Sequence, residues 1–179
     1  DLKSISEERK AVVQKARENA GVRREEIRGK LENLISLLTD RRTQTTESID
    51  AEEASEMDAV EARREARAER IRAAAERKIG AVPPVPDGVR GPARERLVAA
   101  RAKKIAKING DASSDIAVLG EIATMEREAI SADASEKRKA LSEETSSQKN
   151  AERESASVDR ERLASDLKAT VEKARADYE

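Results

Sequence analysis

The side chains in this sequence that could do chemistry are its carboxylates and its cations. The 179 residues include 37 Asp and Glu and 36 Lys and Arg, but neither His nor Cys. The commonest general base and metal ligand is therefore missing, and thiol chemistry is missing too. Many carboxylates stand three or four positions from a cation, as in Glu61/Arg64 and Glu69/Arg72, a spacing typical of ion pairs on a helix surface. We therefore expect no catalytic residue, no metal site, no cofactor and no enzyme activity.

Basic side chains gather in the middle of the chain. Between residues 63 and 107 there are 14 Lys and Arg against 5 Asp and Glu, whereas the segment 112–179 is net acidic. The densest part forms a candidate site for an anionic partner, which we call the basic patch: Arg90, Arg94, Arg96, Arg101, Lys103, Lys104 and Lys107. Such a patch fits an anionic glycan, although an ordinary solvated helix face has the same composition. Nucleic acid is a poor candidate, because Tyr178 is the only aromatic residue that could stack on a base.

One short segment determines which elements carry the basic patch. All four prolines of the chain lie between residues 80 and 92, and the arms on either side contain none. Proline lacks an amide hydrogen and clashes with the preceding turn, so no helix passes through this segment. The dipeptide Asp87-Gly88 predicts a turn, and Gly91-Pro92 predicts the start of a helix. We therefore expect the chain to reverse here.

The arms on both sides of this loop have a helical composition. We expect one helix over about residues 4–80, a loop at 81–91 and a helical arm over 92–178, in which Asn109-Gly-Asp is a turn signal that allows a break at 109–112. At 1.5 Å per residue, the first helix would span roughly 115 Å.

Two polar runs without proline or glycine weaken this assignment. The runs are Asp40 to Ser48, which is rich in threonine, and Ser142 to Asn150. Either could be a loop that folds the chain into a four-helix bundle. We expect bends or short interruptions there rather than reversals, because the spacing of the apolar residues continues across both runs.

Apolar residues recur every eleven positions in both arms. Eleven residues make about three helical turns, which favours straight or slightly right-handed packing. The rows of the first arm are Ile5, Ala16, Ile27, Leu38, Ile49, Val60, Ile71 and Val82, flanked by Val13, Ile35, Met57, Ala68 and Ile79, with Arg24 and Thr46 interrupting the flanking row. The rows of the second arm are Leu97, Ile108, Leu119, Ile130, Leu141, Glu152, Leu163 and Ala174, with a polar break at Glu152, flanked by Ala112, Ala123, Ala134, Thr145, Ala156, Leu167 and Tyr178.

These rows predict an all-α fold: an elongated antiparallel helical bundle or coiled-coil hairpin, with residues 1–179 as a single domain. A reversal centred on the loop would place Ile35 and Leu38 opposite residues 134–141. Because a seam between only two helices buries little apolar surface, we also expect a third segment or self-association to add stability.

The alanine–glutamate texture, as in Ala59-Val-Glu-Ala-Arg-Arg-Glu-Ala66, combines with paired long arms and a central proline-rich turn. In these features the chain resembles the glutamic acid/alanine-rich surface coat protein of trypanosomes. In architecture it also resembles, more distantly, the helical core of the variant surface glycoproteins. The chain departs from the wider coat family in having no disulfide cysteines and no N-glycosylation sequon, and no anchor signal is visible in it.

The resemblance implies a non-enzymatic structural protein with a GPI-type lipid anchor on the extracellular face of the cell surface. Such a protein would shield the membrane, pack against neighbouring coat molecules, attach to the membrane through an anchor outside this chain, and contact the host environment. The alternative is a cytoplasmic coiled-coil scaffold or adaptor that binds a partner helix.

Overall fold

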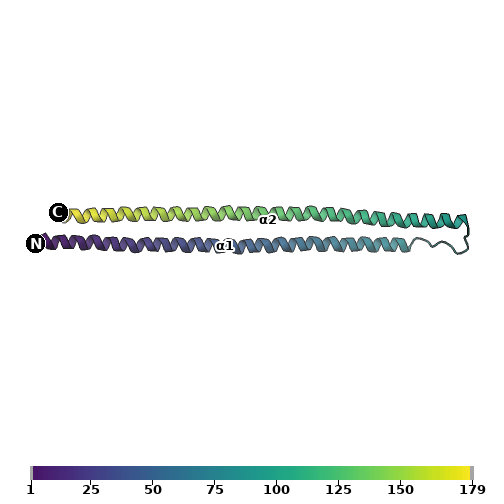
Figure 1. The fold of residues 1–179 in the computed structure, drawn as a ribbon, viewed down its shortest axis with the longest axis horizontal. Helices are drawn as coiled ribbons and strands as arrows, with labels where there is room; N and C mark the ends of the chain where they lie inside the picture. The colour runs from purple at the N-terminus through teal and green to yellow at the C-terminus, as the bar shows by residue number, and fades with distance from the viewer. Residues whose placement is uncertain (1, 178–179) are drawn as a thin grey trace. The chain divides into compact units, whose positions relative to one another are not determined.

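A computed structural model describes residues 2–177 and places most of them in two helices. Helix α1 comprises Leu2–Gly80 and helix α2 comprises Pro92–Ala176 (Figure 1). No residue in the described range is in a β-strand. The all-α, antiparallel helical hairpin is therefore confirmed. The predicted end of the second arm at Tyr178 lies outside the described residues.

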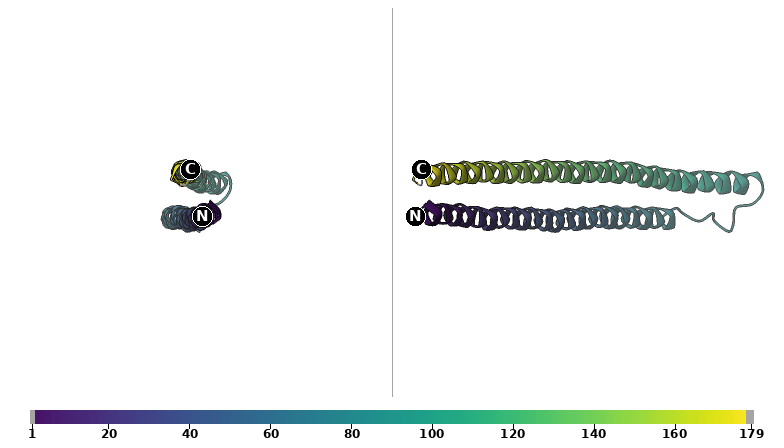
Figure 2. Two further views of the ribbon diagram at one scale, coloured as in Figure 1. Left: turned by 90° about the vertical axis from the view of Figure 1, so that its left-hand side faces the viewer. Right: turned by 60° about the vertical axis from the view of Figure 1, so that its left-hand side comes forward.

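The chain divides into two compact units, and each contains a segment of both helices. Unit 1 combines Asp1–Glu47 with Arg138–Glu179, and unit 2 is the continuous segment Ser48–Lys137. In unit 1, the beginning of α1 and the end of α2 lie side by side (Figure 2). Unit 2 contains the end of α1, the loop and the beginning of α2.

Both helices continue without interruption through the segments where we expected breaks. The helical hydrogen-bonding pattern covers 40–48, 109–112 and 142–150, so the interruptions that we expected at 40–48 and 142–150 and allowed at 109–112 are absent. Threonine favours turns when its hydroxyl competes for backbone groups. Here the hydroxyl groups instead donate to carbonyl oxygens four residues earlier in the same helix. The donors are Thr39, Thr43, Thr45 and Thr46 in α1 and Thr145 in α2.

The loop at 81–91 has the turn chemistry that the sequence predicted. The amide of Val89 donates to the carbonyl of Pro86 at 3.2 Å, which closes a turn around Asp87-Gly88. Gly91 has a φ of 64°, a left-handed conformation that a residue with a side chain rarely adopts. Helix α2 then begins at Pro92, where a missing amide hydrogen costs nothing.

The register of the two helices differs from the one we expected. In unit 1, the Lys149 ammonium group donates to the Thr39 hydroxyl at 2.7 Å, and Leu34 lines a groove together with Glu152. Ile35 and Leu38 therefore lie opposite this part of α2 and not opposite residues 134–141. In unit 2, Lys137 contacts Glu52 at 3.4 Å, which shows an offset in the same direction.

The conformation of the proline segment explains this offset. Residues 82–86 line a groove together with Leu97, Ala100 and Lys104, so they run alongside the first turns of α2. These residues are not helical, and an extended chain rises about 3.1 Å per residue against 1.5 Å in a helix. The loop thus lies beside the first turns of α2, and α1 packs only against the turns that follow them. A reversal with equal arms would need a compact turn, which three prolines in four residues cannot form.

The eleven-residue rows form the buried seam between the helices. Val60 is only 1% exposed and Ala68 only 2%, and both belong to rows identified in the sequence. The other buried members of these rows are Ile49, Val82, Ala123, Ala134, Ala156, Leu163 and Ala174. Thr145 continues one row and is also buried, with its hydroxyl satisfied by the carbonyl of Leu141. Alanine dominates the seam because small side chains let two helices approach closely.

Two predicted core residues are exposed. Leu97 is 44% exposed because the first turns of α2 lie beside the thin proline segment instead of a helix. Ile5 is 40% exposed, because the observed register places it beyond the last turn of α2, which ends at Ala176. A third row was missed in α1, where Ala20 and Ala75 are buried. Its intervening members include Glu53 and Arg64, which are half-buried and conceal the apolar period.

Enlarging a seam alanine should separate the helices. We expect Ala68→Leu to reduce the free energy of unfolding by about 2 kcal/mol, because the seam has no space for three more carbon atoms. The matched control is Ala66→Leu, two residues away on an exposed position, which should change the stability by less than about 0.5 kcal/mol. Thermal and urea unfolding followed by circular dichroism measures both. Equal effects of the two substitutions on the free energy of unfolding would contradict the burial of Ala68 between the helices.

Candidate anionic-partner site

The structure places the whole basic patch in unit 2. Arg90 lies in the loop, and the other six cations lie in the first turns of α2, between Arg94 and Lys107. All seven side chains are exposed, and Arg90 follows the half-buried Val89. The loop therefore brings the seven residues into one short region of a single unit, as the sequence suggested.

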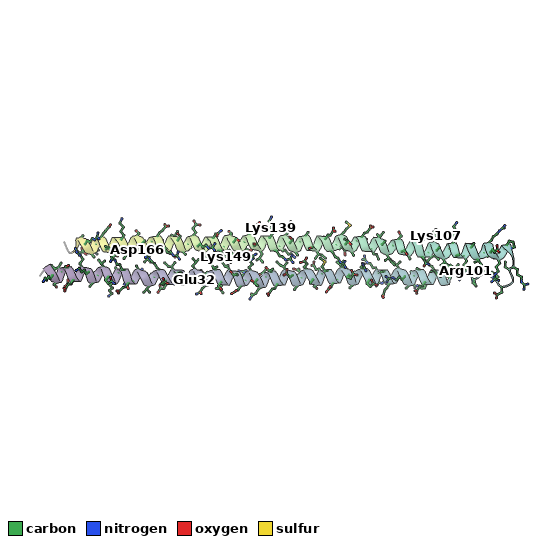
Figure 3. All side chains as sticks on the ribbon, viewed as in Figure 1. Glu32, Arg101, Lys107, Lys139, Lys149 and Asp166 are labelled. Atoms are coloured by element: carbon green, nitrogen blue, oxygen red, sulfur yellow. The ribbon has the colours of Figure 1, made fainter. Side chains whose placement is uncertain are left out.

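The cations on α2 do not all point to the same side. Seven residues make two helical turns, so Arg94 and Arg101 share one side of the helix. Arg96, Lys103 and Lys107 share another. Figure 3 shows Lys107 pointing away from α1, whereas Arg101 lies on the side where the chain returns. The patch therefore consists of two faces with different surroundings.

The face of Arg101 borders an apolar groove of about 360 Å³. Arg101 and Lys104 supply its cations. The apolar lining consists of Val82, Pro83, Pro84, Val85, Pro86, Leu97 and Ala100. The face of Arg96, Lys103 and Lys107 contributes no residue to this groove and is open to solvent.

The patch also differs from the rest of unit 2 in its electrostatics. Within residues 2–177, no hydrogen bond or ion pair engages the side chains of the seven cations. Elsewhere in the unit, cations pair with carboxylates of the other helix: Arg127 with Glu61, and Arg63 with Glu126 at 3.5 Å. The field of the patch is therefore not neutralised by contacts within the protein.

Pairing shifts the pKa of two side chains in unit 2. A hydrogen bond from Arg72 holds the pKa of Glu65 below its ordinary value, with the positive charge of Arg72 adding to the effect. A hydrogen bond to Asp133 raises the pKa of Lys137 above its ordinary value. Both shifts favour the charged forms, so these residues act as partners in surface ion pairs.

Sequence reasoning identified some ion pairs and missed others. The predicted pair of Arg64 with Glu61 is present at 3.0 Å, but Arg72 contacts Glu65 at 3.0 Å and not the predicted Glu69. The pairs that join α1 to α2 were missed altogether. Finding them requires the register, and the sequence contains no local signal for the pairing of Arg127 with Glu61.

The arrangement presents exposed positive charge beside an apolar groove. Among the described residues, no group of three or more acidic side chains is placed to hold a metal ion. Neither helix contains, over the same residues, a stretch apolar enough to span a lipid bilayer. No known family, curated protein or solved structure matches this chain. The site must therefore be interpreted from its own residues.

Proposed function

We propose that this chain is a non-enzymatic structural protein of a cell-surface coat, held by a lipid anchor outside the sequence and facing the host environment. The observation that supports the proposal is the seam. The buried side chains among the described residues lie between α1 and α2 or under the loop, and most of them are alanine. Each unit is thus only two helices thick, with charged side chains outside. Thin, highly charged molecules can pack densely side by side on a membrane and still remain hydrated.

The organisation of the units is compatible with such a coat. The first turns of α1 and the last turns of α2 belong to unit 1, where Val13 and Gln14 lie near Val171. An anchor attached beyond the C-terminus would therefore hold unit 1. The basic patch belongs to unit 2, so the residues that would meet an external partner are separate from those that would meet the anchor.

Surface labelling of intact source cells tests this proposal. The protein should react with a membrane-impermeant amine reagent, because most of its lysines are exposed, and a phospholipase specific for phosphatidylinositol should release it. A cytoplasmic protein in the same sample is the control and should stay unlabelled. Labelling that occurs only after the cells are permeabilised would contradict a surface location.

An exposed apolar stripe on α2 favours a second candidate function, a helical scaffold that associates with itself. Val118, Ile122 and Met125 follow one another at spacings of four and three residues and are 49%, 41% and 69% exposed. The solvent-accessible surface area of the chain is 13502 Å², whereas a compact monomer of its mass would expose about 8,600 Å². We assign a second copy of this chain as the occupant, because the two-helix seam leaves this apolar area uncovered in every copy.

Charge placed in the stripe should prevent this association. We expect the wild-type protein to have about twice the monomer mass at roughly 100 µM, and Val118→Glu/Met125→Glu to be monomeric, since four carboxylates would meet across the dimer contact. Ser113→Glu/Ala117→Glu adds the same charge on another side of α2 and should leave the dimer intact. Light scattering coupled to size exclusion measures the mass. A wild-type protein that stays monomeric at 19.6 kDa would rule out this function.

A further inference from the structure

Three cations of the basic patch form a straight row along α2. Arg96, Lys103 and Lys107 are spaced by seven and four residues, which are close to two turns and one turn of helix. With a rise of 1.5 Å per residue, the row extends over roughly 16 Å. All three side chains are exposed, and Lys107 points away from α1 (Figure 3). We call this set the cation row.

The helix surface along the cation row contains no negative charge until Asp111, one turn beyond Lys107. No Asp or Glu occurs between Glu95 and Asp111, so a span of fifteen residues contains only cations and uncharged side chains. Ala99 and Ala100 lie between Arg96 and Lys103 in the sequence, and their short side chains leave room for a ligand at the helix surface. A long molecule can therefore approach all three cations together. This differs from α1 of the same unit, where Glu65 and Glu69 interrupt the basic residues.

We propose that the cation row, with Lys104 beside it, binds a linear glycan that carries sulfate or carboxylate groups at regular intervals. Cations spread along 16 Å can engage several anionic groups of one chain at once, whereas a small anion would contact only one or two of them. Each exposed contact is weak, and the affinity comes from their number. This inference goes beyond the coat function, since it holds wherever the protein resides.

The surroundings of the cation row favour a glycan over the two other polyanionic surfaces. A lipid bilayer would be bound best where apolar side chains insert beside the cations. The apolar groove is lined by Arg101 and Lys104, and none of Arg96, Lys103 and Lys107 lines it. Single-stranded nucleic acid is commonly held by bases that stack on aromatic rings, and unit 2 contains no aromatic residue.

Heparin, used as the probe, tests the site through two variants of equal charge. Neutralising the row in Arg96→Gln/Lys103→Gln/Lys107→Gln should weaken binding about tenfold at roughly 0.15 M salt. The matched control is Arg67→Gln/Arg70→Gln/Lys78→Gln, which removes three exposed cations from α1 in the same unit and should change affinity less than about twofold. Glutamine is a good helix former, so both variants should keep the fold, which circular dichroism checks.

The outcomes of this experiment are distinct. A tenfold loss in the row variant alone, together with weak binding of chemically desulfated heparin, supports the proposal. Equal losses in both variants would show that the total charge matters and not the row, which would overturn it. Tighter binding to phosphatidylserine vesicles or to duplex DNA than to heparin would overturn the choice of a glycan. Cell-surface labelling does not enter any of these results, so failure here and failure of the coat function are told apart.

Discussion

The conformation of the proline segment is the constraint on which the arrangement of unit 2 depends. Proline cannot take part in helical hydrogen bonding, so residues 82–86 return along α2 in a non-helical conformation. An extended residue covers about twice the distance of a helical one along the axis. Helix α1 therefore meets α2 several turns after Pro92. This offset leaves the first turns of α2 beside a thin loop, and it is there that the basic patch stays exposed and unpaired.

The seam shows how a chain with so little apolar volume holds two helices together. Alanine contributes little transfer free energy per residue, but it lets the helix axes approach and brings the helix backbones and neighbouring side chains into van der Waals contact. Long polar side chains then complete the seam from its edges. Arg127 is half-buried and reaches Glu61 on the opposite helix. Its aliphatic stem covers the seam while its charged group stays near solvent.

Much of this fold could be predicted from the sequence, because its main signals are local. The prolines predicted the loop at 81–91, and the eleven-residue spacing predicted the burial of Val60, Ala68 and most of the buried alanines. The basic patch was visible for the same reason, since its members are close in sequence. The pairs between helices and the exposure of Leu97 could not be predicted, because they depend on the register. The row that contains Arg64 was missed because its charged members conceal the apolar period. Register follows from the path of the loop, which composition does not specify.

The most direct test of this account is the register within unit 2. The natural sequence has no cysteine, so Glu61→Cys can be combined with Arg127→Cys, the observed partner, or with Asp111→Cys, the position that a symmetric reversal would place opposite. A short thiol-to-thiol cross-linker should join the first pair within one chain in dilute solution. It should not join the second, whose sites are separated by roughly 24 Å along the helix axis. Cross-linking of residues 61 and 111 but not of 61 and 127 would contradict the account.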